Sequence, residues 1–236
     1  MHGMQGQLFD NLPEQLSPMP AGAAHPIGPG AMHLPGFIGT HAAAILATIQ
    51  AISRQAPFRH MMTPGGHAMS VSMTNCGPLG WITDAQGYRY SRTDPASQLP
   101  WPPLPADLET LARAAAAAAG YPDFRPEACL INCYAPGSRM GLHQDRDEAD
   151  LSAPIVSFSL GRSATFLWGG ARRNDPVARI ILQQGDAIVW GGPSRLYFHG
   201  IAPLARRCAP QEPELRYNLT FRRVTRLALR DEGGTR

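Results

Sequence analysis

Hydrophobic residues recur at helical spacing in two stretches of the chain. Residues 41–55, HAAAILATIQAISRQ, repeat apolar positions with the period of an amphipathic helix, and Thr40 before them is the expected N-cap. Residues 107–120, DLETLARAAAAAAG, predict a second helix, because Gly120 is a typical helix terminator. We therefore expect two helices in the first half of the chain.

Beyond Pro126 the pattern changes to short apolar runs separated by turn residues. The runs that predict strands are ACLINCY, PIVSFSL, SATFLWG, ARIILQ, DAIVWGG, RLYFHGI and RYNLTFRR. Many short strands at this spacing are typical of an all-β sandwich or barrel such as a jelly roll. The expected fold class is mainly β with flanking helices (α+β), without internal repeats.

The remaining segments are interpreted from their composition. Residues 1–35 are rich in Pro, Gly and Ala, which predicts an irregular N-terminal arm. Strand-like pieces in residues 57–101 are broken by TPGG and CGPLG, which predicts a small sheet with long loops. With 236 residues, 44% of them hydrophobic, the chain suits one domain. We expect that domain over 36–225, with its β-rich core at 126–225 and a tail at 226–236.

All 21 basic residues are arginine, and the formal net charge is +3. The absence of lysine excludes a GxxxxGK[ST] phosphate loop, a Schiff-base enzyme and a kinase-type catalytic lysine. Arginine offers a planar fork of donors that suits carboxylate or phosphate ligands. The four cysteines form no CxxC pair, and neither a leader nor a membrane-length apolar run is evident. We expect a cytoplasmic protein that does not bind membranes.

Residues 142–148, LHQDRDE, concentrate imidazole and carboxylate groups before a strand-like run. In an extended strand His143 and Asp145 point to the same side, and His199 could add a third ligand. Two imidazoles and one carboxylate form the facial triad that holds non-haem Fe(II) and leaves positions open, although zinc accepts such ligands too. Taken alone, one HxD pair favours a surface turn, with His199 as a core histidine, over a metal site.

The run RYNLTFR alternates polar and apolar side chains. One face of this predicted strand carries the polar set Arg216, Asn218, Thr220 and Arg222, and the other carries Tyr217, Leu219 and Phe221. The two guanidinium groups lie about 20 Å apart along an extended strand. They could bind opposite ends of a small dicarboxylate such as 2-oxoglutarate. An edge strand with solvated arginines would show the same pattern.

Several longer stretches resemble a known family. They are MTPGGHAMSVSMTNCGPLGW, QGYRYS, AAGYPDF, LHQDRDE, APIVSFSLG, RRNDP, AIVWGG, SRLYFHGI and RYNLTFR. Over about residues 57–223 the chain resembles the AlkB family of Fe(II)- and 2-oxoglutarate-dependent nucleic-acid dealkylases. The resemblance implies a double-stranded β-helix (jelly roll) whose N-terminal nucleotide-recognition lid is the segment 57–101. It also implies Fe(II), 2-oxoglutarate and O₂ as cofactor and cosubstrates.

The resemblance assigns roles to individual residues. The iron ligands, which are also the catalytic residues, are His143, Asp145 and His199. The 2-oxoglutarate contacts are Asn132, Tyr134, Arg216, Asn218 and Arg222, and Thr220 joins them from the same polar face. In the lid, Trp81 is expected to stack the damaged base against His143, with Tyr88 and Tyr90 near the substrate backbone. Asp147 is expected to meet the exocyclic amino group of the base, and Arg173 to make a further substrate contact. The sequence departs from close relatives at Cys133, His67 and Gly141, none of which is a ligand position.

The implied reaction is oxidative demethylation of 1-methyladenine and 3-methylcytosine in single-stranded DNA, with RNA as a further substrate. It releases formaldehyde, succinate and CO₂, and the enzyme is expected to act as a monomer. One alternative is a 2-oxoglutarate-dependent oxygenase that acts on a substrate other than nucleic acid, which would not need the lid segment. An inactive nucleic-acid-binding module would be expected to lack a ligand. A metal-dependent sugar-binding jelly roll would leave Arg216 and Arg222 unexplained.

Overall fold

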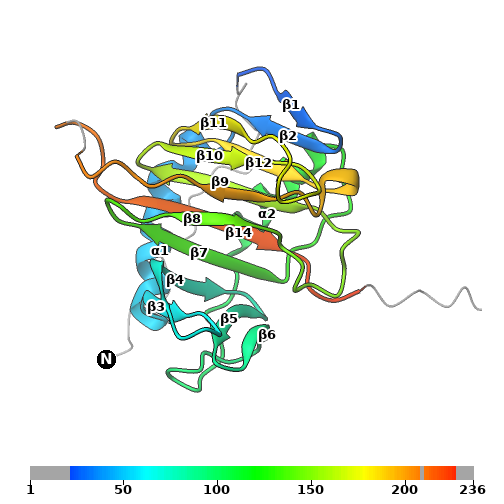
Figure 1. Ribbon diagram of the computed structural model, residues 1–236. Helices are drawn as coiled ribbons and strands as arrows, with labels where there is room; N and C mark the ends of the chain where they lie inside the picture. The colour runs from blue at the N-terminus through cyan, green and yellow to red at the C-terminus, as the bar shows by residue number, and fades with distance from the viewer. Residues whose placement is uncertain (1–21, 208–209, 227–236) are drawn as a thin grey trace, which may run out of the picture.

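The computed structural model describes residues 22–207 and 210–226, and two antiparallel sheets form its centre (Figure 1). In spatial order, the larger sheet contains β1 (His25–Gly28), β2 (Ala31–Leu34), β12 (Ala187–Trp190), β9 (Ile155–Gly161), β14 (Arg216–Arg222), β7 (Ala128–Tyr134), β4 (Ala68–Cys76) and β3 (Arg59–Met62). The smaller contains β11 (Ala178–Leu182), β10 (Ala164–Trp168), β13 (His199–Ile201) and β8 (Met140–His143). Two such sheets confirm the predicted mainly β fold with a jelly-roll core.

Two helices cover the larger sheet on the face away from the smaller one, behind the strands in Figure 1. They are α1 (Ala42–Gln55) and α2 (Ala106–Ala118), close to the predicted ranges. Their apolar stripes pack on the outward side chains of the central strands, among them Phe158, Leu219 and Phe221. This burial explains why the RYNLTFR run needs one apolar face.

The prediction that Thr40 caps the first helix is wrong. Thr40 lies inside a 3-10 turn, η1 (Gly39–His41), and the N-cap is His41, which makes no side-chain capping bond. The backbone N–H of Ala42 instead donates to the carbonyl of Gly39. A preceding turn that accepts N–H groups removes the need for a hydroxyl cap.

Aromatic and aliphatic side chains fill much of the space between the two sheets. Phe166 and Trp168 from the smaller sheet pack with Trp190 and Ile188 from the larger. Towards one end the filling stops, and a cavity of about 580 Å³ opens between the sheets. The fold therefore leaves an open end where a ligand can enter.

The predicted irregular arm, residues 1–35, is wrong for residues 25–34, while residues 1–21 lie outside the described range. Residues 25–34 form the β1–β2 hairpin, and β2 pairs with β12 at the edge of the larger sheet. Asp186 anchors the hairpin, because its carboxylate lies 3.0 Å from His33 Nε2 and accepts the Gly36 N–H at 2.8 Å. Tertiary pairing thus orders a segment whose composition predicts irregularity.

This anchor should make stability depend on pH. Burial alone would raise the pKa of Asp186, but the His33 contact and the N–H groups of Gln183 and Gly36 lower it below 3.8. A carboxyl group whose folded pKa is lowered stabilises the fold above its unfolded pKa, and this contribution disappears as the pH falls through the folded pKa. We expect Asp186→Ala to cost about 1.5 to 3 kcal/mol of unfolding free energy at pH 7. In urea melts the difference in unfolding free energy from the wild type should shrink as the pH falls below about 4; a difference that does not change with pH would contradict the role.

The prediction that the segment 57–101 forms one small sheet of its own is wrong. Strands β3 and β4 extend the larger sheet beside β7, because β4 pairs with β7 from Ser72 to Cys76. Only β5 (Gly80–Asp84) and β6 (Gly87–Ser91) stand apart, as a hairpin that we call the lid hairpin. Figure 1 shows it at the bottom of the view, beyond β4 and below β7.

Two further predictions need correction or limits. The run RLYFHGI is a strand only over β13, because η2 (Gly192–Ser194) and irregular backbone precede it. Most of the predicted tail 226–236, from residue 227 onward, lies outside the described residues, as does Cys208. Within the described part of the chain, each helix is too short or too polar to span a bilayer.

Candidate active site

Three side chains converge at the floor of the cavity. His143 on β8 and His199 on β13 are directly paired across neighbouring strands, and Asp145 follows two residues after His143. The His143 Nε2 lies 3.6 Å from one oxygen of Asp145, and the His199 Nε2 lies 3.7 Å from the other. All three donor atoms lie within 4.8 Å of one another, as a shared metal ion requires.

Backbone contacts orient both imidazoles for metal binding. The Nδ1 of His143 is 2.9 Å from the Gly141 carbonyl, and the Nδ1 of His199 is 3.0 Å from the Tyr197 carbonyl. A carbonyl only accepts, so each Nδ1 carries the hydrogen and each Nε2 directs a lone pair towards Asp145. This is the tautomer that a metal ligand needs.

The charges of the cluster are also suited to a cation. Burial lowers the pKa of His199 to about 4, so its imidazole is neutral at pH 7. Burial alone would raise the pKa of Asp145, but Arg222 and the two imidazoles hold it well below its usual range. The neutral imidazole of His199, the imidazole of His143 and the carboxylate of Asp145 together match the donor set for Fe(II).

The approach of Asp145 differs from the prediction of a continuous strand. Strand β8 ends at His143, and residues 144–148 have irregular backbone. Arg222 holds the Asp145 side chain instead, because its Nη2 donates at 2.7 Å and its Nε at 3.2 Å to the same oxygen. The ion pair with Arg222 on β14, and not the alternation of side chains along a strand, directs the Asp145 carboxylate towards the two histidines.

Arg216 forms the opposite wall of the cavity. It is 1% exposed, and its guanidinium lies 5.0 Å from the ring centroid of Tyr134, with one bond from Nη2 to Ser159 at 3.1 Å. Its Nε and Nη1 are buried without a hydrogen-bond partner, although Arg216 lines the cavity. Buried unpaired donors are costly, so this arrangement fits an anionic ligand that completes them.

A row of polar groups connects the two ends of the cavity along β7 and β14. The pairs Arg216 with Tyr134 and Asn218 with Asn132 lie opposite each other. Asn132 donates to the Asn218 oxygen at 3.0 Å, and Thr220 donates to the same oxygen at 3.0 Å. The side-chain oxygen of Asn132 has no partner. All six predicted 2-oxoglutarate contacts, Asn132, Tyr134, Arg216, Asn218, Thr220 and Arg222, line the cavity.

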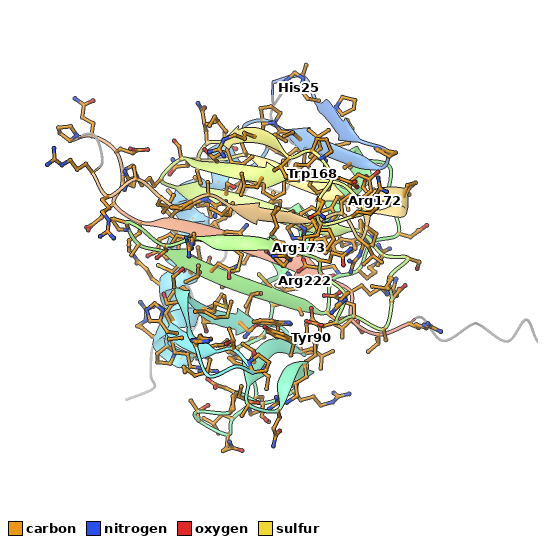
Figure 2. All side chains as sticks on the ribbon, in the orientation of Figure 1. His25, Tyr90, Trp168, Arg172, Arg173 and Arg222 are labelled. Atoms are coloured by element: carbon orange, nitrogen blue, oxygen red, sulfur yellow. The ribbon has the colours of Figure 1, made fainter. Side chains whose placement is uncertain are left out.

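The lid hairpin supplies one side of the cavity mouth. Trp81 and Tyr88 line it, and their rings stack at 5.6 Å with an angle of 18°. The Trp81 indole N–H donates to Asp147 at 2.8 Å, so the lid hairpin meets residues 144–148, which we call the metal loop, at the entrance. Arg173 also lines the cavity and donates to the Leu142 carbonyl at 3.0 Å (Figure 2).

Tyr90 does not line the cavity, unlike the other four predicted substrate residues. Its hydroxyl donates to Glu148 at 2.5 Å, and in Figure 2 it lies below Arg222. Burial raises its pKa well above 10, so the phenol stays protonated as a donor. Of the three departures, Gly141 lines the cavity and its carbonyl contacts His143, whereas Cys133 and His67 do not line the cavity.

Sequence reasoning gave no role to Glu148 and Arg195, which the structure places behind the metal cluster. The Glu148 side chain is 1% exposed and contacts Arg195 Nη2 at 2.9 Å and Arg222 Nε at 3.3 Å. Arg195 Nη1 also donates to the backbone carbonyl of Asp145 at 2.5 Å. The sequence shows Glu148 as the last residue of LHQDRDE, which could have marked it as a candidate. Its arginine partners could not be predicted, because they come from distant segments.

Comparison with known proteins agrees with this geometry. Residues 30–222 match the family model described as the 2OG-Fe(II) oxygenase superfamily. The chain is 55% identical over 199 residues to the alpha-ketoglutarate-dependent dioxygenase AlkB of Salmonella typhimurium, covering 84% of this chain and 92% of that protein. For the AlkB homolog of Caulobacter vibrioides (strain NA1000 / CB15N) the identity is 43% over 202 residues, covering 83% and 88%.

A solved structure shares the fold as well. The structure of OsALKBH1 superposes with a TM-score of 0.74 at 28% identity, covering 85% of this chain and 99% of that one. The chain therefore belongs to the 2OG-Fe(II) oxygenase superfamily and, within it, to the AlkB family of Fe(II)- and 2-oxoglutarate-dependent dioxygenases.

Proposed function

We propose that this dioxygenase demethylates N-alkylated bases, 1-methyladenine and 3-methylcytosine, in single-stranded DNA and RNA, acting as a monomer. The observation that carries the proposal is one cavity with a metal triad at its floor, an unpaired buried arginine in its wall and an aromatic hairpin at its mouth. The relatives named above are dioxygenases, and a human relative, 40% identical over 124 residues, is named nucleic acid dioxygenase ALKBH1.

Each wall of the cavity has a separate task in this reaction. His143, Asp145 and His199 would hold Fe(II), and Arg216 would bind the far carboxylate of 2-oxoglutarate through its free N–H groups. Bound Fe(II), 2-oxoglutarate and O₂ together would supply the oxidising chemistry for hydroxylation of the N-methyl carbon. The hydroxymethyl product then releases formaldehyde and the repaired base. Trp190 and Phe166 pack against His199 and present apolar surface, which excludes water from this end of the cavity.

The mouth has the groups needed to read a flipped base. Trp81 offers an aromatic face, and Asp147 keeps one carboxylate oxygen for an exocyclic amino group while the other accepts the Trp81 indole N–H. Adenine and cytosine carry such an amino donor on the edge that methylation blocks. A methylated base no longer pairs well, so extruding it costs less than extruding a normal base.

The direct test is formaldehyde release from matched DNA and RNA oligomers that carry one methylated base. We expect release only with Fe(II), 2-oxoglutarate and O₂ together, and more from single strands than from duplexes. An enzyme that consumes 2-oxoglutarate but releases formaldehyde from no methylated oligomer would refute the nucleic-acid substrate. That result would favour the alternative of an oxygenase acting on another class of molecule.

The lid should affect lesion turnover separately from cosubstrate chemistry. We expect Trp81→Ala to lower turnover of methylated oligomers by about 5- to 150-fold, because base stacking on an aromatic contributes about 1 to 3 kcal/mol. Consumption of 2-oxoglutarate without nucleic acid should change little, since Trp81 is at the mouth and does not belong to the metal cluster. Trp81→Phe is the matched control, as it keeps a ring. Equal loss of both activities in Trp81→Ala would count against stacking.

A further inference from the structure

Glu148 connects the lid hairpin to the metal loop. It accepts the Tyr90 hydroxyl from β6 at 2.5 Å, and the two residues are 58 positions apart in the sequence. Tyr90 on β6 lies directly opposite Trp81 on β5 in the register of the hairpin. Through Tyr90, the position of the hairpin that carries Trp81 is tied to a carboxylate buried behind the active site.

Glu148 is held on its other side by two arginines that organise the metal loop. Arg195 is buried, and its three nitrogens donate to Glu148, to the Ala153 carbonyl and to the Asp145 carbonyl. Arg222 contacts both Glu148 and the Asp145 carboxylate. Two carboxylates and two guanidinium groups thus form a closed, charge-balanced cluster, which a buried position requires.

The free nitrogen of Arg222 gives this cluster a consequence for ligand binding. Its Nη1 is buried without a partner, and Arg222 lines the cavity. A metal ion bound to Asp145 would compete with Arg222 for that carboxylate and would leave Glu148 as the second carboxylate that holds the Arg222 guanidinium. The position of the Arg222 guanidinium at the cavity then depends on Glu148, which is in turn bonded to Tyr90.

We propose that Glu148 is a positioning residue that couples closure of the lid hairpin to keto-acid binding, with Tyr90 as its contact on the lid and Arg222 as its contact at the cavity. This rests on the proposed role of Arg222 in 2-oxoglutarate binding. Coupling between two sites is reciprocal, so the bound keto acid must also favour the closed lid.

The test uses the full chain with Mn(II), which binds without turnover. Titration with 2-oxoglutarate gives the dissociation constant, and hydrogen exchange reports the protection of amides in residues 80–91. In the wild type, adding 2-oxoglutarate should increase that protection. Tyr90→Phe should weaken 2-oxoglutarate binding about 5-fold or more, the usual lower range of such coupling, and should abolish the gain in protection. Tyr90 itself lines no part of the cavity, so a direct contact cannot explain such a loss.

Two further variants separate coupling from general loss of structure. Tyr121→Phe also removes one hydroxyl bond, to the Gly30 carbonyl at 2.8 Å, and should leave both measurements unchanged. Glu148→Gln keeps an acceptor for Tyr90 but removes the charge, and should weaken keto-acid binding more than Tyr90→Phe does. Wild-type binding and wild-type protection in Tyr90→Phe would overturn the proposal. Neither measurement uses nucleic acid, so a failure of the proposed demethylation is distinguishable from a failure of the coupling.

Discussion

Replacing Asp145 with alanine is expected to abolish metal binding and demethylation together. Asp145 supplies the only carboxylate among the three donor atoms that lie within 4.8 Å of one another in the described part of the chain. Removing even an outer partner of a metal ligand costs about 10- to 100-fold in affinity or activity, so losing the ligand should exceed about 100-fold. Competition with a chelator measures metal affinity, and formaldehyde release measures activity.

Asp147→Ala is the matched control for this prediction. It removes a carboxylate two residues further along the same loop, at the mouth and bonded to Trp81. This variant should bind metal like the wild type and lose turnover of methylated bases only. Metal affinity and activity retained by Asp145→Ala would remove Asp145 from the metal site.

The second large effect is expected at Arg216. Arg216→Leu should raise the KM for 2-oxoglutarate about 30- to 4,000-fold, because truncating one partner of a buried charge pair costs about 2 to 5 kcal/mol. The same change should leave the unliganded protein as stable as the wild type, or more stable. Its guanidinium is buried with unpaired Nε and Nη1, and burial lowers its pKa, so without ligand it is a destabilising group.

This opposite response distinguishes a binding residue from a structural one. Arg59→Leu is a suitable control. Arg59 forms an ion pair with Asp94, with 2.6 Å between nitrogen and oxygen, and does not line the cavity. It should lower the melting temperature without changing the KM. A marked loss of stability in unliganded Arg216→Leu, with an unchanged KM, would contradict the assigned role.

Local patterns predicted the strands that contact the core, because period and burial coincide there. RYNLTFR alternates as expected, with Leu219 and Phe221 under the helices and Arg216 and Asn218 in the cavity. The triad was predicted from an HxD pair and one later histidine. The structure adds that His143 and His199 are paired across two strands.

Patterns failed where long-range contacts decide the structure. Residues 25–34 look irregular by composition, yet pairing with β12 and the Asp186 anchor makes them strands. The resemblance implied that Tyr90 lies near the substrate backbone, and this role stays a prediction; nothing in the sequence indicated that its hydroxyl donates to Glu148. Glu148 had no predicted role because its partners are distant in the sequence. Arg195 lies 47 residues further along the chain, and Arg222 is the last residue of β14.

The unfilled end of the sandwich has a thermodynamic consequence. Side chains from both sheets stop short of a space of about 580 Å³ that buried guanidinium and amide groups surround. In other β-sandwiches the side chains of the protein itself fill the space between the sheets. Here the metal ion and the keto acid would fill this end of it. Since a ligand that binds only the native chain adds RT ln(1 + [L]/Kd) to its stability, about 2.7 kcal/mol at a concentration of 100 Kd, heat resistance should follow cosubstrate supply. The free energy of unfolding of the protein thereby depends on the concentration of the metabolite that it consumes.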